Sequence, residues 1–224
     1  MKKIALIVAG GTGVRMQSSV PKQFMVLKNL PILMHAINAF YTYDSSLEIR
    51  VALPENEMDS WKQLCMEYHF KKKHTLVSGG ETRFHSVKMS LTDIPKPSLV
   101  AVHDGVRPLV NPATIANCYK IAGEFGTAIP VVPVNESIRK VNEDDSIAED
   151  RSLYRIVQTP QVFHSDILIN SYNVEFKQSF TDDASVVENA GFKIYITEGN
   201  EENIKITRPI DLLIADAIMT GLPV

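Results

Sequence analysis

The sequence lacks the features of secreted and membrane proteins. It has two cysteines in 224 residues, Cys65 and Cys118, and neither belongs to a Cys-x-x-Cys motif. Its first three residues, Met-Lys-Lys, are followed by only a six-residue apolar segment, which is too short for a secretory leader. No apolar run approaches the roughly 20 residues that a membrane-spanning helix needs. We therefore expect a cytoplasmic protein with reduced thiols and no membrane partner.

Excess positive charge and metal-binding patterns are also missing. The formal net charge is −3, so the chain as a whole does not attract nucleic acid, and no nucleic-acid partner is expected. The basic run at residues 71–73 is expected in a solvated loop. The six histidines are scattered without the spacing of metal ligands, and no metal site built from them is expected.

Two common phosphate-binding motifs are absent. A Walker motif would close its loop with Gly-Lys-Ser/Thr, but Gly13 is followed by Val14, Arg15 and Met16. A dinucleotide-binding motif would have a third glycine at Met16 and an acidic residue closing the second strand, where the chain has Pro54. The sequence is therefore not that of a P-loop protein, and NAD binding is disfavoured.

A glycine-rich loop, residues 10–13, directly follows the first predicted strand, residues 4–9. Its glycines let the backbone turn with N–H groups facing outward. Two cationic side chains, Arg15 and Lys22, lie within reach of an anion held there. For such a motif taken alone, a tight turn with solvated basic residues is the alternative. We interpret the loop as a site for the phosphates of a nucleoside triphosphate.

Apolar runs alternate with segments of helical periodicity through the first 132 residues. The strands are continuous apolar runs, whereas Leu33, Ile37 and Phe40 show the spacing of a helix packed on a sheet. This pattern predicts a single α/β domain over residues 1–224, Rossmann-like, with a mostly parallel sheet covered by helices on both faces. The predicted strands are 4–9, 49–53, 74–77, 99–103 and 127–132, and the predicted helices are 31–42, 56–70, 82–92 and 112–124.

The alternation ends at Pro133. Two short apolar segments flank an acidic turn at residues 142–145 and predict a two-stranded β-arm at about 134–153 that leaves the main body. An isolated hairpin is marginal in water, so we expect the arm to pack on a second copy and form a homodimer. The later predicted elements are a helix from about 165, a helix from Asp183 to Gly191, strands 193–197 and 204–206, and a last helix 209–220.

Polar clusters follow several of the predicted strands, at the edge where an open α/β sheet binds its ligands. They lie at residues 10–22, 79–86, 103–108 and 203–207. Together they supply backbone amides, a hydroxyl for a base edge, acids for ribose hydroxyls or Mg²⁺, and cations for phosphates. Lys205 lies between two isoleucines, a position that is costly for a lysine unless it meets an anion.

In this order the clusters resemble the motifs of the sugar-phosphate cytidylyltransferases, and most closely those of the members that act on 2-C-methyl-D-erythritol 4-phosphate. The resemblance covers nearly the whole chain. Its motifs are residues 9–16, 21–24, 79–83, 103–108, 150–151, 158–161, 181–182 and 203–209.

The resemblance implies transfer of a cytidylyl group from CTP to that polyol phosphate, with release of pyrophosphate, in non-mevalonate isoprenoid biosynthesis. It implies a need for Mg²⁺, held largely by CTP phosphates with Asp104 as the candidate protein ligand. The implied catalytic residues are Arg15, Lys22 and Lys205. The implied nucleotide-binding residues are Ala9, Gly10, Gly11, Gly13, Gly80, Glu81, Ser86 and Asp104, and the implied acceptor-binding residues are Arg107, Ser137, Arg151, Thr181 and Lys205.

The chemistry of such a transfer fits a site rich in cations. A phosphate monoester has a second pKa of about 6, so it is already a nucleophile at pH 7 and needs no strong base. The obstacle is repulsion between two anionic substrates, which cations and Mg²⁺ relieve where charge builds up in the transition state. We therefore expect charge placement to be the main source of catalysis.

Three departures from the family pattern are Glu81 for aspartate, Glu136-Ser137 for Asp-Thr, and Gly105 for alanine, and they bear on acceptor preference more than on reaction class. One alternative is a cytidylyltransferase for another polyol phosphate, such as ribitol 5-phosphate. A second is a nucleotide-binding regulatory module without turnover. Structural roles are the alternative for Thr159 with Pro160 (a turn), Asp182 (a helix cap) and Arg208 (a solvated side chain).

Overall fold

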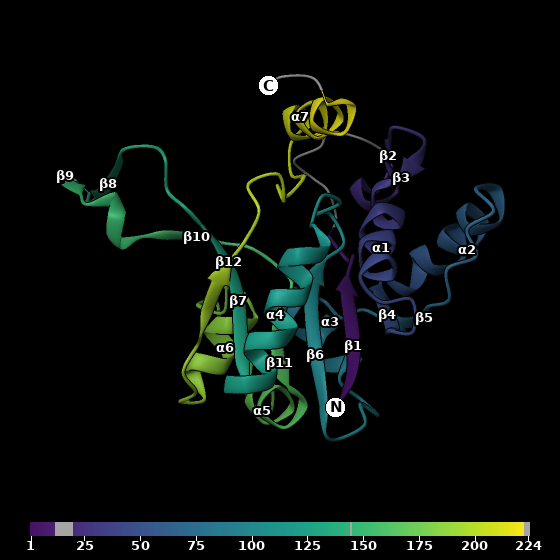
Figure 1. The fold of residues 1–224 in the computed structure, drawn as a ribbon, viewed down its shortest axis with the longest axis horizontal. Helices are drawn as coiled ribbons and strands as arrows, with labels where there is room; N and C mark the ends of the chain where they lie inside the picture. Colours follow the sequence, from purple (N-terminus) through teal and green to yellow (C-terminus); the bar gives the residue numbers. More distant parts are fainter. Residues whose placement is uncertain (12–19, 144, 222–224) are drawn as a thin grey trace.

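The computed structural model describes residues 1–11, 20–143 and 145–221. In this part of the chain, one 8-stranded sheet has the strand order β10-β7-β11-β6-β1-β4-β5, with β12 paired to β7 (Figure 1). The strands are β1 (Lys2–Val8), β4 (Glu48–Leu53), β5 (Thr75–Ser78), β6 (Ser98–Asp104), β7 (Thr127–Pro133), β10 (Arg155–Val157), β11 (Gln161–His164) and β12 (Ile196–Glu198).

Most neighbouring strands are parallel, as the sequence predicts. Strand β1 pairs in parallel with β4 and β6, and β5 and β12 continue that direction on β4 and β7. The exceptions are β11, which lies antiparallel between β6 and β7, and β10, which is antiparallel to β7. The carboxyl ends of β1 and β6 are adjacent, because Val8 is in register with Asp104.

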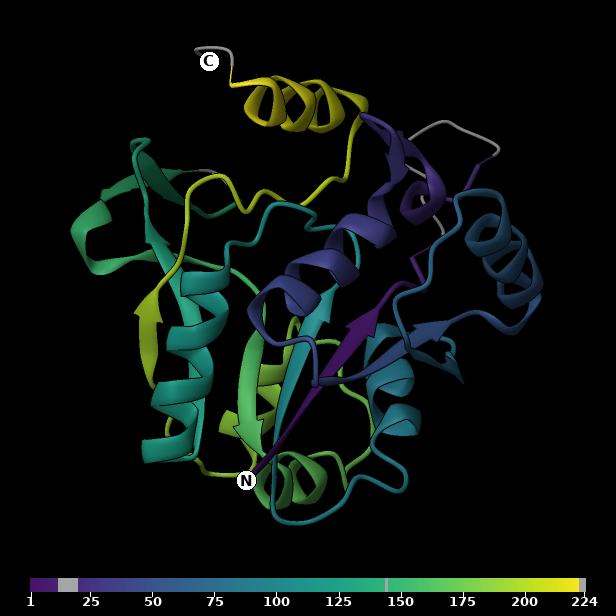
Figure 2. The ribbon, with the colours of Figure 1, turned by 45° about the vertical axis from the view of Figure 1, so that its right-hand side comes forward.

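Helices cover both faces of the sheet, which confirms the predicted layers. On one face are α1 (Ile32–Tyr43), α2 (Met58–Glu67) and α4 (Pro112–Phe125), and α1 and α4 lie side by side (Figure 2). On the other are α3 (Arg83–Ser90), α5 (Ser165–Ser171) and α6 (Asp183–Asn189). Strand β1 serves both cores, since Ala5 and Ile7 pack with the first group and Ile4 and Leu6 with the second.

Side-chain caps fix where the helices beside the future site begin. The hydroxyl of Thr82 accepts a hydrogen bond from the N–H of His85 at the start of α3. The amide oxygen of Asn111 accepts one from the N–H of Thr114 at the start of α4. Asp182 accepts the N–H of Ser185 in a capping box that starts α6, so its structural role is confirmed. The helix predicted at 56–70 is shorter than expected: residues 55–57 form a 3-10 turn before α2, and α2 ends at Glu67, before His69 adopts a left-handed backbone conformation (φ 50°).

The predicted arm is present as a two-stranded projection. Strands β8 (Ile138–Val141) and β9 (Ser146–Glu149) pair antiparallel, and Figure 1 shows them extending away from the main sheet. A 3-10 turn, η4 (Arg151–Leu153), follows. The side chains of Val141 and Leu153 are 74% and 79% exposed, so this chain does not cover them. Association of two copies through the arm stays a prediction.

The last helix, α7 (Pro209–Thr220), lies beyond the edge of the sheet at which β1 and β6 end (Figures 1 and 2). Its Ala215 packs in a small apolar cluster with Leu27 of the hairpin formed by β2 (Val26–Leu27) and β3 (Leu30–Pro31), while the 3-10 turn before this hairpin, η2 (Lys22–Phe24), buries Phe24 in the first core. The strand predicted at 204–206 is wrong. Ile206 donates one hydrogen bond to the carbonyl of Val106 (2.9 Å), and no ladder forms.

No helix in the described ranges has the length and apolar character to cross a membrane.

Candidate active site

A cavity of about 280 Å³ lies at the carboxyl ends of β1 and β6. The sequence motifs meet here, as expected for an open α/β sheet. The residues that line it are Val8, Ala9, Gly10, Gly11, Lys22, Gln23, Glu81, Thr82, Arg83, Ser86, Asp104, Val106 and Lys205. Of the nucleotide residues implied by resemblance, the structure thus gathers Ala9, Gly10, Gly11, Glu81, Ser86 and Asp104 around one space.

A second cavity of about 240 Å³ adjoins the first. It is lined by Arg83, Asp104, Arg107, Val157, Gln158, Thr159, Gln161, Thr181, Asp182 and Lys205. Arg107, Thr181 and Lys205, which the resemblance assigns to the acceptor, are therefore brought together. Three residues, Arg83, Asp104 and Lys205, line both cavities and form the wall between them.

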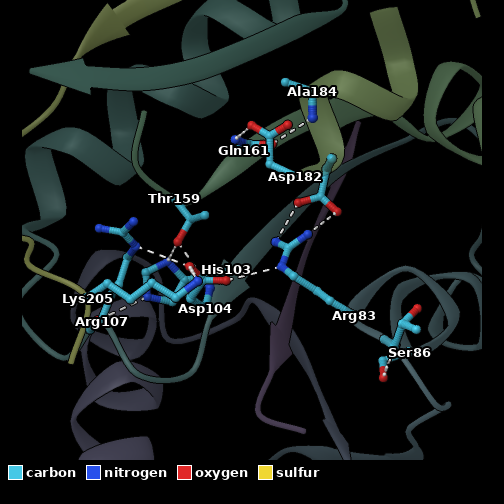
Figure 3. A network of polar contacts seen from close by, with 12 residues as sticks. Arg83, Ser86, His103, Asp104, Arg107, Thr159, Gln161, Asp182, Ala184 and Lys205 are labelled. Atoms are coloured by element: carbon cyan, nitrogen blue, oxygen red, sulfur yellow. Dashed lines mark hydrogen bonds and ion pairs between the residues drawn. The ribbon is translucent and has the colours of Figure 1, made fainter. Parts of the chain in front are cut away.

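Asp104 is the centre of this shared wall (Figure 3). Its Oδ1 accepts the Nε–H of Arg83 (3.2 Å), and its Oδ2 contacts Nε of Arg107 (3.2 Å) and Nζ of Lys205 (3.0 Å). Burial alone would raise the pKa of this carboxyl, but Arg83, Lys205 and Arg107 hold its pKa far below the usual range. Asp104 is therefore an anion that gathers three cations beside two cavities.

Lys205 is 40% exposed as a side chain, so its ammonium group is accessible from the cavities even while it contacts Asp104. The expectation that this lysine meets an anion is met within the protein itself. A substrate phosphate in the second cavity would share the same cation.

Lys22 extends across the glycine loop. A Cβ atom at Gly11 would lie 3.3 Å from the Nζ of Lys22, so this position leaves room only for glycine unless the lysine shifts. Gly13 and Arg15 lie outside the described residues. Gly10, Gly11 and Lys22 line one cavity, and the binding of phosphates by this loop stays a prediction.

Ser86 and Gly80 build the turn that borders the first cavity. The hydroxyl of Ser86 accepts the N–H of Gly80 (3.1 Å) and donates to the carbonyl of Thr82 (3.0 Å). A Cβ at Gly80 would lie 2.5 Å from the Cβ of His85, which explains the glycine. Ser86 is 2% exposed, and its contacts hold the turn, so recognition of a base by this hydroxyl stays a prediction.

A chain of hydrogen bonds fixes the backbone of Asp104. Its N–H donates to the hydroxyl of Thr159 (3.0 Å), which in turn contacts Nδ1 of His103 (3.0 Å), and Nε2 of His103 contacts the carbonyl of Arg107 (3.1 Å). Because a carbonyl only accepts, His103 donates through Nε2, and Nδ1 accepts from Thr159. Burial lowers the pKa of His103 to about 4, so it is neutral at pH 7.

This histidine makes stability depend on pH. The pKa of His103 is about 4 in the folded state and 6.5 as the ordinary value. Its contribution is therefore complete above pH 6.5 and is lost as pH falls toward 4, with a total on the order of 3 kcal/mol. Urea unfolding of wild type and His103→Gln from pH 7 to pH 4 should show a steeper loss in the wild type. His69→Asn, an exposed histidine, is the control and should keep the wild-type slope.

Ser137 and Arg151 do not line either cavity of their own chain. Both lie on the arm and are exposed, and Arg151 donates from Nη1 to the carbonyl of Asn135. Arg208 is exposed, in agreement with its structural alternative.

Sequence reasoning did not assign the residues that support the wall from behind. Arg83 belongs to the motif at residues 79–83, but its partner Asp183 is 100 residues away in the chain. Gln161 is buried and donates to Asp182 (2.7 Å) while accepting the N–H of Ala184 (2.8 Å), which fixes the start of α6 (Figure 3). Gln161 belongs to the motif at residues 158–161, but no local sequence pattern indicates these contacts.

A family model described as 2-C-methyl-D-erythritol 4-phosphate cytidylyltransferase matches residues 3–221. A protein of that name from Bacteroides thetaiotaomicron is 49% identical over 219 residues, covering 98% of this chain and 100% of the relative. One from Bacillus velezensis is 38% identical, covering 98% and 96% of the two chains.

Solved structures agree with these matches. The crystal structure of the enzyme of that name from Thermus thermophilus superimposes with a TM-score of 0.79 at 29% identity, covering 98% of this chain and all of that one. An Anaerococcus prevotii structure titled 4-diphosphocytidyl-2C-methyl-D-erythritol synthase has a TM-score of 0.83 at 23% identity and supports the fold. The motifs, the fold and the full-length matches lead to one conclusion: this chain belongs to the 2-C-methyl-D-erythritol 4-phosphate cytidylyltransferase family.

Proposed function

We propose that this protein transfers a cytidylyl group from CTP to 2-C-methyl-D-erythritol 4-phosphate, giving 4-diphosphocytidyl-2-C-methyl-D-erythritol and pyrophosphate, as a step of isoprenoid biosynthesis. Its family membership supports this reaction. The single observation that carries it is the pair of adjoining cavities whose shared wall holds the cations Arg83 and Lys205 around Asp104. Two anionic substrates have to be held side by side, and this wall provides positive charge at their boundary.

The first cavity suits the nucleotide. Gly10, Gly11 and Lys22 line it, so backbone amides and an ammonium group would hold the phosphates, and Glu81 borders the space where a ribose would lie. The second cavity suits the acceptor phosphate, with Arg107 and Lys205 as its cations. An oxygen of the acceptor phosphate attacks the α-phosphorus of CTP. The bond from that phosphorus to the oxygen bridging to the β-phosphorus breaks, and pyrophosphate leaves with the electron pair.

Mg²⁺ fits this site mainly as a companion of the nucleotide. When bound, it would neutralise phosphate charge and polarise the oxygens around the α-phosphorus. The carboxylates of Glu81 and Asp104 line the nucleotide cavity, but both oxygens of Asp104 already receive cations. We therefore propose that phosphate oxygens supply most ligands, as is usual for Mg²⁺ at nucleotide sites.

We also propose that the protein is cytoplasmic, where its two free thiols would stay reduced. Burial raises the pKa of Cys65 to about 11 and that of Cys118 to about 12, so both stay protonated and unreactive at neutral pH.

The reaction is tested by pyrophosphate release with each of four nucleoside triphosphates against a panel of polyol phosphates. CTP with 2-C-methyl-D-erythritol 4-phosphate should give the highest kcat/KM, and mass spectrometry should show the diphosphocytidyl product. A preference for ribitol 5-phosphate would favour the other polyol-phosphate enzyme. Equal turnover with ATP or GTP would contradict the assignment, and nucleotide binding without turnover would favour the regulatory module.

We further propose that the arm completes the acceptor site of a second copy. Val141, Ile147 and Leu153 on the arm are exposed, and a second copy would bury them. Arg151 lies in the same 3-10 turn as Leu153. Arg151→Ala should raise the Kd for the polyol phosphate and leave the Kd for CTP nearly unchanged, both measured by calorimetry.

Mixing Arg151→Ala with Lys22→Ala tests the shared site directly. A heterodimer then has one site with both residues intact, so an equal mixture should recover about a quarter of wild-type activity. Each variant mixed with itself is the control. An active monomer in sedimentation, or no recovery after confirmed subunit exchange, would exclude the shared site.

A further inference from the structure

Arg83 lies in the wall between the two cavities, yet its polar contacts are with the protein. Its Nη1 and Nη2 donate to Oδ1 and Oδ2 of Asp183 (2.9 and 2.7 Å), and its Nε donates to Oδ1 of Asp104 (3.2 Å). A paired contact of this kind fixes both the position and the plane of the guanidinium. Arg83 is thus held between two carboxylates, one of which belongs to the site.

Asp183 is built to hold that arginine. It is fully buried and is the first residue of α6. The hydroxyl of Tyr172 donates to its Oδ1 (2.7 Å). Burial and then the neighbouring Asp183 raise the pKa of Tyr172 well above its usual range, so the hydroxyl keeps its proton and remains a donor. Both oxygens of Asp183 are therefore occupied, and it contacts neither cavity itself.

The pairing limits what Arg83 offers to Asp104. Since both terminal nitrogens are turned to Asp183, only Nε reaches Oδ1 of Asp104. The other oxygen, Oδ2, is left to Arg107 and Lys205. If Asp183 lost its charge, Asp104 would be the remaining carboxylate in contact with Arg83. A bidentate pair between these two would occupy both oxygens and displace Lys205 and Arg107.

We propose that Asp183 is a positioning residue for the transfer reaction. By holding Arg83 through both terminal nitrogens, it reserves one oxygen of Asp104 for Lys205 and Arg107 and so keeps these two cations at the boundary where the acceptor phosphate is held. The proposal rests on the proposed function for the identity of that acceptor, and on the contacts alone for the arrangement of the wall.

The kinetic test compares Asp183→Asn in two backgrounds. In the wild-type background, the KM for the polyol phosphate should rise about 10-fold or more, because the acceptor cations lose their orientation. In the Arg83→Met background, the same change should alter this KM by less than about 2-fold, because the arginine that transmits the effect is gone. Tyr172→Phe, which removes one hydrogen bond but no charge, is the matched control and should change the KM by less than about 3-fold.

An equal loss from Asp183→Asn in both backgrounds would overturn the proposal, since Asp183 would then act without Arg83. An unchanged KM in the wild-type background would do the same. Melting temperatures of all variants separate loss of fold from loss of orientation. The double variant is informative here, because it contains no unpaired buried charge at this position.

A crystal structure of the Asp183→Asn variant tests the arrangement without any turnover. It should show Arg83 turned onto both oxygens of Asp104 and Lys205 displaced from its 3.0 Å contact. If Arg83 and Lys205 keep their positions, the proposal fails. This readout stands even if the wild-type protein does not use the proposed acceptor, so failure of the function and failure of the positioning are distinguishable.

Discussion

Lys22→Ala should lower kcat by about 10²-fold or more, because a preorganised positive charge at developing transition-state charge is typically worth that much. Lys22 lines the nucleotide cavity and extends over Gly11, where the phosphates of CTP would lie. The free energy of unfolding should change by about 1 kcal/mol or less, as for most partly exposed side chains. Steady-state pyrophosphate release and urea unfolding measure the two effects on the same preparation.

Lys62→Ala is the matched control for that measurement. Lys62 is an exposed lysine on α2 that pairs with Asp59 (2.8 Å), and it lines neither cavity. Its loss should leave kcat within about 2-fold, since exposed ion pairs contribute little. Wild-type turnover in a folded Lys22→Ala variant would contradict the assigned role. On the sequence alone, Arg15→Ala is expected to behave like Lys22→Ala.

Asp104→Asn should be the most destabilising single change in the site. It removes the carboxylate that contacts Lys205, Arg107 and the Nε of Arg83. The positive charges of these side chains then repel one another at close range. Removing one member of a buried ion pair costs about 3 kcal/mol or more, because the partner's charge stays uncompensated. Thermal or urea unfolding should show this loss, together with a large fall in turnover.

An added anion should partly repair that variant. Inorganic phosphate binds where the missing carboxylate leaves excess positive charge, so it should raise the Tm of Asp104→Asn more than the Tm of the wild type. Asp59→Asn, which removes an exposed carboxylate paired with Lys62, is the control and should leave stability nearly unchanged, because exposed ion pairs contribute little. Wild-type stability of Asp104→Asn would show that the three cations do not depend on this carboxylate.

Local patterns sufficed for the elements whose apolar residues face the core in a regular period. The alternation of β1, α1, β4, α3, β6, α4 and β7 was predictable because each buries its own stripe or face. Strand β11 was not, because its four residues begin with the buried polar Gln161 and pair only once β6 and β7 are in place. Residues 204–206 have a strand-like pattern, but Ile206 donates a single hydrogen bond to the carbonyl of Val106 and the segment does not pair with a strand.

The site divides in the same way. Asp104 and Lys205 were predictable, because an acid that ends a buried strand and a lysine between two isoleucines both call for a charged partner. The pairing of Arg83 with Asp183 was not, since no local pattern relates residues 100 positions apart. Ser86 lines the first cavity with the other residues of its predicted group, but its hydroxyl is engaged with the turn at Gly80, which the sequence does not indicate.

Lys205 stands on a segment, residues 203–207, that joins no strand ladder and is held by separate contacts with Arg107, Thr159 and the first turn of α7. Beside it, Ile206 is anchored by one backbone hydrogen bond and by the small cluster of Leu27, Ile32, Val106 and Ala215 under α7. Such a region opens at a lower free energy than the central sheet. On gradual heating, activity should therefore disappear several degrees before the far-UV circular dichroism of the whole fold changes, so the enzyme's working temperature range is set by its C-terminal helix.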